Sequence, residues 1–132
     1  MSTQLSLISA LILIVIFMGL SVFQLLLALG KPYGKMAYGG RQEAVLPRNY
    51  RIMSAISIVI FLIASMFVLV KIEVFTNCPF PAINTLGIWI FALFLALNTI
   101  ANATSKSSSE RKFMTPLSAI ACLCLVIIAL GL

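Results

Sequence analysis

The charged residues best suited to bind a ligand stand immediately before two long apolar segments of the chain. Arg48 and Arg51 precede one of these segments, and Arg111 and Lys112 precede the other. If each segment is a helix, its first turn presents unpaired N–H groups and the positive end of the helix dipole beside these side chains. Helix starts of this kind bind anions. The pattern therefore predicts a site for a lipid phosphate or another anionic ligand.

Polar side chains on the approach to the second segment extend this candidate site. Glu110 most simply pairs with an arginine, for which Arg51 is a candidate, and such a pair would hold two parts of the chain together. A catalytic role for Glu110 with Asn102 and Ser105 is the weaker hypothesis, because a single carboxyl group without His or Asp offers little acid–base chemistry. We therefore predict no catalytic residue and favour a protein that is not an enzyme. The candidate ligand-binding residues are Arg48, Arg51, Asn102, Ser105, Glu110, Arg111 and Lys112.

The composition disfavours metal and redox chemistry. The chain contains no His and no Asp, and its three Cys are too scattered to form a cluster with ligand spacing. Cys122 and Cys124 lie two positions apart, which is about 200° around a helix, so they face different directions. These two cysteines are more simply packing residues. We expect neither a metal nor a cofactor.

The elements that must position these residues belong in a membrane. Of the 132 residues, 62% are hydrophobic and 9% are charged, whereas soluble domains have about 25% charged residues. Four apolar segments, about 5–29, 52–70, 82–101 and 114–132, approach or exceed the roughly 20 residues that a helical span requires. The sequence therefore predicts an all-α protein with a single transmembrane domain over residues 1–132, a four-helix bundle built from two helical hairpins.

The basic residues predict how the bundle is oriented. Five of the nine Lys and Arg residues lie in the loop 30–51 and three lie in the loop 102–115. By the positive-inside rule both loops face the cytoplasm, and both termini then lie outside. The net charge of +6 therefore indicates attraction to anionic membrane lipids and not to nucleic acid.

The predicted spans lack the ionisable residues that transporters and pumps usually carry deep in the membrane. Gln24 alone interrupts the apolar run of the first span, which disfavours proton-coupled export. Ser54, Ser57 and Ala64 in the second span are more simply a helix-packing seam than a polar path. A small transporter or channel remains the alternative function. It would need a homo-oligomer, because four helices alone enclose little space.

Glycine and tyrosine crowd the first predicted loop. Four of the seven Gly lie within 30–40, and all three Tyr lie in the same loop. Glycine and proline set turns and tyrosine favours the lipid head-group level, so this loop is expected to fold against the membrane surface. In the other loop, Thr115 is a candidate N-cap with Pro116 at the first helical position. The predicted structural loop residues are Gly30, Pro32, Gly34, Gly39, Gly40, Pro47, Thr115 and Pro116.

Two stretches of these loops form a recognisable pattern. The first comprises Leu29-Gly30-Lys31-Pro32-Tyr33-Gly34, Gly39-Gly40, Leu46-Pro47, Arg51 and Ser54, and the second comprises Asn102, Ser105-Lys106-Ser107, Glu110-Arg111 and Thr115-Pro116. In both, the chain resembles a widespread group of small, uncharacterised four-span membrane proteins of bacteria. The resemblance implies a multi-pass protein of the bacterial cytoplasmic (inner) membrane and no particular activity. We expect a non-enzymatic protein whose cytoplasmic face binds an anionic lipid head group, a small ligand or a membrane protein partner.

Overall fold

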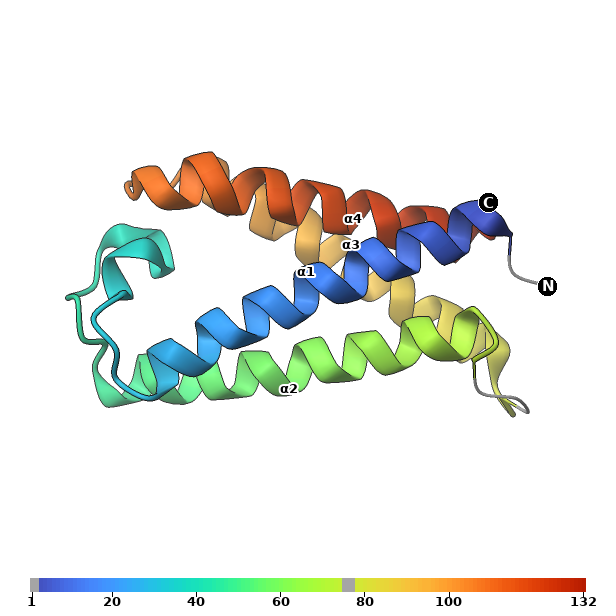
Figure 1. Cartoon of the computed structure of the whole chain (residues 1–132), viewed down its shortest axis with the longest axis horizontal. Helices are drawn as coiled ribbons and strands as arrows, with labels where there is room; N and C mark the ends of the chain where they lie inside the picture. Colours follow the sequence, from blue (N-terminus) through green and yellow to red (C-terminus); the bar gives the residue numbers. More distant parts are fainter. Residues whose placement is uncertain (1–2, 75–77) are drawn as a thin grey trace.

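The protein folds as a bundle of four long helices. The computed structural model describes residues 3–74 and 78–132, and within these ranges the chain forms no strand. The helices are α1 (Gln4–Ala28), α2 (Arg48–Lys71), α3 (Pro81–Ala103) and α4 (Thr115–Leu130), shown in Figure 1. Each is long and apolar enough to cross a membrane, α4 together with the turn that begins at Glu110. The predicted all-α four-helix bundle is therefore confirmed.

The start of α2 differs from the predicted span 52–70. The helix begins at Arg48, directly after Pro47, so its first turn includes Arg51. Apolar composition marks the part of a helix that can lie in hydrocarbon, whereas a helix can continue into the polar head-group region with charged residues. The two arginines are therefore helical residues and not part of the loop.

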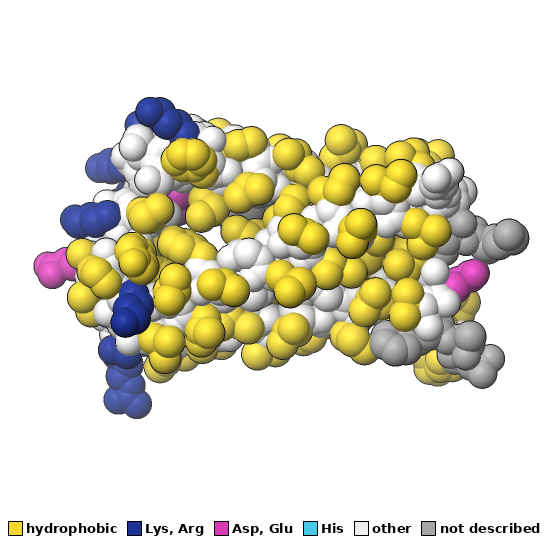
Figure 2. Space-filling model, viewed as in Figure 1, with side chains coloured by type: hydrophobic (Ala, Val, Ile, Leu, Met, Phe, Trp, Pro, Cys, Tyr) yellow, Lys and Arg dark blue, Asp and Glu magenta, His cyan; other side chains and the backbone are white. Residues whose placement is uncertain are grey.

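The helices pack as a ring in which α1 and α3 each contact both α2 and α4. Both termini lie at one end of the bundle, and the connections α1–α2 and α3–α4 lie at the other end (Figure 1). Ser6 Oγ donates a hydrogen bond to the Leu132 carbonyl over 2.8 Å, which joins the start of α1 to the end of the chain. Lys and Arg side chains gather at the loop end (Figure 2), which we call the basic end, and the opposite end is the terminal end.

The main hydrophobic core fills the terminal half of the bundle. Leu13 of α1 and Leu125 of α4 are completely buried there, and several alanines face the same core. Small side chains allow close helix approach, which matters in a membrane because lipid supplies no hydrophobic drive for association. Large side chains on the outer faces, such as Leu11 at 66% exposure, are left for lipid. The buried core alanines are Ala10, Ala64, Ala92, Ala121 and Ala129.

Candidate functional site

A second, smaller core lies beneath the loop at the basic end. Leu27 of α1 packs there against Ala37 and Leu46 of the loop between α1 and α2. The loop can return over the helix end because Gly30 has a φ of +87°, which favours glycine. Gly34 donates its N–H to the Ala44 carbonyl over 2.7 Å, which closes the loop on itself. Both glycines belong to the predicted structural loop residues.

Tyr38 joins the same loop to the first turns of α2. Its hydroxyl lies 2.9 Å from Ser54 Oγ, and its ring meets the Tyr50 ring edge-on at a centroid distance of 4.9 Å. Burial raises the pKa of the Tyr38 phenol above its usual value, the hydrogen bond with Ser54 lowers it and the neighbouring Tyr50 raises it. The net effect is an increase, so the phenol, which is protonated at neutral pH even at its usual pKa, stays protonated.

Three buried polar residues organise the connection between α3 and α4. Ser107 Oγ accepts a hydrogen bond from the Glu110 N–H over 3.4 Å, and Ser105 Oγ accepts one from the Ser107 N–H over 3.0 Å. A Ser-x-x-Glu sequence often forms a capping box, in which the glutamate side chain would reach back to the Ser107 N–H. Since Ser105 already occupies that N–H, the Glu110 carboxyl group is available for another partner.

The Glu110 carboxyl group binds the loop between α1 and α2. Its Oε2 accepts a hydrogen bond from the Gly39 N–H over 3.2 Å, and the Gly39 carbonyl accepts one from the Lys106 N–H, also over 3.2 Å. Gly40 lies so close to Ser107 that a Cβ added at Gly40 would stand 2.9 Å from the Ser107 nitrogen. These five residues, which we call the loop clasp, join the two connections of the basic end.

The predicted pairing of Glu110 with Arg51 is not formed. Arg51 Nε instead donates to the Ala28 carbonyl at the end of α1 over 3.1 Å. The guanidinium lies against Gly30, where an added Cβ would stand 3.3 Å from Arg51 Cζ. The two connections are nevertheless held together by Glu110, through a backbone N–H in place of an arginine.

The predicted N-cap role of Thr115 is wrong. Residues 108–114 are already helical, and Glu110–Met114 form a π-helical turn that leads into α4. Thr115 has a helical backbone, and its Oγ1 donates to the Glu110 carbonyl over 3.2 Å. Pro116 has no N–H to offer the preceding turn, which favours this local widening of the helix. The cap is supplied earlier in the chain, by Ser107.

A cavity of about 580 Å³ lies between the main core and the loop clasp. Met36, Ala37, Tyr38 and Gly39 cover it at the basic end, and side chains of all four helical segments form its walls. Figure 2 shows the surface hollowed at the basic end, between α1 and the start of α4. The polar side chains of its wall are Gln24, Ser57, Asn98, Asn102, Glu110 and Ser118.

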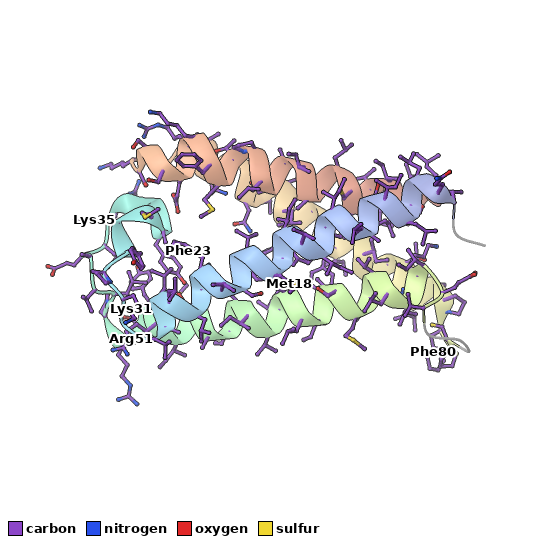
Figure 3. All side chains as sticks on the ribbon, in the orientation of Figure 1. Met18, Phe23, Lys31, Lys35, Arg51 and Phe80 are labelled. Atoms are coloured by element: carbon purple, nitrogen blue, oxygen red, sulfur yellow. The ribbon has the colours of Figure 1, made fainter. Side chains whose placement is uncertain are left out.

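Predicted site residues are divided between this cavity and the outer surface. Asn102 and Glu110 line the cavity. Arg48, Lys112 and the side chain of Arg111 lie outside it, and Arg111 Nη1 donates to the Ser105 carbonyl beneath the clasp. Lys31, Lys35 and Arg51 also lie at the basic end (Figure 3). Among the described residues that line the cavity, none is Lys or Arg.

Asn98, which lies beside Asn102 in the cavity wall, is a site residue that the sequence did not predict. Their spacing of four places them on one face of α3, and this was a usable signal. Gln24 is the polar interruption of the first predicted span, and the structure places it in the cavity wall. Ser57 belongs to the predicted packing seam, but in the structure it lines the cavity.

Comparison with known proteins identifies no relative of this chain. No family model matches the chain, and no match is found among curated proteins or solved structures. The fold and the cavity therefore define the class of protein by themselves: a four-helix integral membrane protein with an amphipathic cavity at its basic end.

Proposed function

We propose that this protein binds one amphipathic molecule in the cavity without changing it chemically. The observation that supports the proposal is the arrangement of polar and apolar residues along the cavity wall. Gln24, Asn102 and Glu110 lie towards the basic end, whereas Leu20 and Phe61 lie towards the middle of the bundle. A molecule with a polar head group and one apolar chain matches this order. The volume also lies within the roughly 300–1,000 Å³ that is usual for small-molecule sites.

The hollow between α1 and α4 suits entry from the membrane. It opens on a side of the bundle whose outer residues, such as Val15 and Met18, are exposed and apolar. An apolar cavity that opens to hydrocarbon fills more favourably with an apolar chain than with water. The ligand would therefore move laterally out of the lipid layer.

Narrowing the cavity is expected to weaken this binding. Ala101 and Ala103, two positions apart on α3, are both exposed, but only Ala101 lines the cavity. We expect Ala101→Phe to weaken binding of a single-chain lipid such as monoolein at least tenfold, and Ala103→Phe to leave it unchanged. Native mass spectrometry of the protein in detergent, titrated with monoolein, measures both. Equal binding by the two variants would refute the proposal.

The orientation and the outer anion site are also part of the proposal. By the positive-inside rule the basic end faces the cytoplasm of a bacterial cell, with both termini outside the inner membrane. Arg48, Arg51, Arg111 and Lys112 would then meet anionic head groups outside the cavity. Basic residues near such a surface contribute about 1 kcal/mol each.

Anionic lipid is expected to raise the melting temperature of the wild-type protein in liposomes more than that of Arg51→Ala. Arg41→Ala is the matched control, because Arg41 is an exposed loop residue and its loss changes the net charge equally. If anionic lipid stabilises both variants as much as the wild type, the basic end attracts lipid without a specific site at Arg51.

A small transporter remains the second candidate. It is favoured by one observation, the buried Glu110 at the start of the fourth candidate span, where it lines the cavity. Ionisable residues at membrane depth often mark transport routes. Leu13 and Leu125, both completely buried, close the terminal half beyond the cavity. Transport would therefore require a second conformation, and a flux of monoolein-like ligand across liposomes would distinguish transport from binding.

A further inference from the structure

We infer that the cavity selects an amphipathic molecule whose head group donates hydrogen bonds and has no negative charge. This inference rests on the proposed function and names the ligand class for the same cavity. It depends on two lining residues, Gln24 of α1 and Glu110 of the π-helical turn. Both offer acceptor oxygens that the protein itself does not saturate.

Gln24 has an unsatisfied acceptor. Its Oε1 is buried and has no hydrogen-bond partner. A buried carbonyl oxygen without a partner has lost its hydrogen bonds to water, so a donor supplied by a ligand is favoured. Because rotation about the Cγ–Cδ bond of glutamine (χ3) has broad minima, this oxygen can turn to meet a hydroxyl group in the cavity.

Glu110 adds an acceptor and sets the charge of the cavity. Its Oε2 accepts from Gly39, and Oε1 has no hydrogen bond to any residue that the structure describes. Arg111 and Arg51 do not line the cavity, and they are engaged elsewhere, since Arg111 donates to the Ser105 carbonyl and Arg51 to the Ala28 carbonyl. An anionic head group in the cavity would therefore lie beside a carboxyl group without a compensating cation, which is unfavourable in a site shielded from water.

Three ligands with the same chain separate these effects: monoolein, methyl oleate and oleate. Monoolein has two hydroxyl donors, methyl oleate has none, and oleate has none and is anionic. At neutral pH we expect monoolein to bind the wild-type protein in a one-to-one complex about tenfold more tightly than methyl oleate, with oleate the weakest. Native mass spectrometry of the detergent-solubilised full chain gives the three dissociation constants.

Variants of Gln24 and Glu110 test which residue is responsible for each ligand preference. Gln24→Leu is expected to reduce the preference for monoolein over methyl oleate to about threefold or less, whereas Gln4→Leu, the same exchange at an exposed position of α1, leaves it unchanged. Glu110→Gln keeps an acceptor for the Gly39 N–H and removes the charge, so it is expected to strengthen oleate binding at least tenfold. Circular dichroism melting curves establish that each variant is folded.

The outcomes of these experiments test the inference about the head group separately from the proposed function. Wild-type binding of oleate as tight as that of monoolein, or an unchanged preference in Gln24→Leu, overturns the inference about the head group. If all three ligands bind equally and Ala101→Phe blocks them all, the cavity binds amphipathic molecules and only this inference fails. If none of the three binds saturably, the proposed function fails and the inference fails with it.

Discussion

Gly87→Ala is expected to destabilise the bundle by about 1–3 kcal/mol, the usual effect of overpacking a core. A Cβ at this position of α3 would stand 2.0 Å from Phe67 Cε2 and 2.4 Å from Phe67 Cδ2 of α2. The ring has little freedom to yield, because it also packs edge-on against Phe91 at a centroid distance of 5.6 Å. The Phe67 backbone is fixed as well, since its carbonyl accepts a hydrogen bond from Asn84 Nδ2 over 3.0 Å.

Gly19→Ala is the control for this effect. It introduces the same methyl group within α1, where an added Cβ would meet nothing within 4 Å, and alanine favours a helix over glycine by about 1 kcal/mol. Unfolding in mixed micelles with rising denaturing detergent gives the free-energy change of each variant. A Gly87→Ala protein as stable as Gly19→Ala would contradict the close packing of α2 on α3.

Gly40→Ala is expected to open the loop clasp. The residue has a φ of +70°, where an alanine loses about 1–2 kcal/mol, and the new Cβ would stand 2.9 Å from the Ser107 nitrogen and 3.0 Å from its Cβ. Both effects act against the docked loop. We expect the clasp to lose about 2 kcal/mol or more, which corresponds to roughly thirtyfold faster hydrogen exchange at the Lys106 N–H.

Gly131→Ala is the control for placing an alanine at a positive φ far from the loop clasp. Gly131 has nearly the same φ, +71°, but an added Cβ there would meet nothing within 4 Å. This variant is expected to leave exchange at Lys106 unchanged, because it lies at the terminal end of the bundle. Slow Lys106 exchange in Gly40→Ala would show that the two loops are not fastened together at Gly40 and Ser107.

The sequence was sufficient to predict the four helices and the position of the charges. Apolar segments of spanning length leave few alternatives, since a lipid-exposed backbone must satisfy its own hydrogen bonds. The Ser107-x-x-Glu110 spacing was also a visible N-cap signal. Pro116 favours Thr115 as the N-cap, but proline is also compatible with the π-helical turn that the structure has there.

The partner of Glu110 and the cavity could not be predicted from the sequence. Glu110 binds the N–H of Gly39, a residue 71 positions away, and this N–H is presented by a loop whose Tyr38 and Gly39 both have positive φ. The cavity arises because large buried residues of the main core, such as Leu13 and Leu125, lie in the terminal half of the bundle, while the next core begins only beneath the loop. A gap between two cores depends on the tertiary packing of four helices and leaves no local pattern in the sequence.

The most direct test of the central claim is photo-crosslinking with a monoacylglycerol that has a diazirine in its chain, followed by mass spectrometry of the labelled peptides. Occupation of the cavity predicts labels at inward residues such as Ile60 and Phe61. Excess monoolein is expected to suppress these labels, and Ala101→Phe is expected to remove them. Labels confined to outward residues such as Leu11 and Val15, and insensitive to competition by monoolein, would contradict the claim that an amphipathic molecule binds inside the bundle.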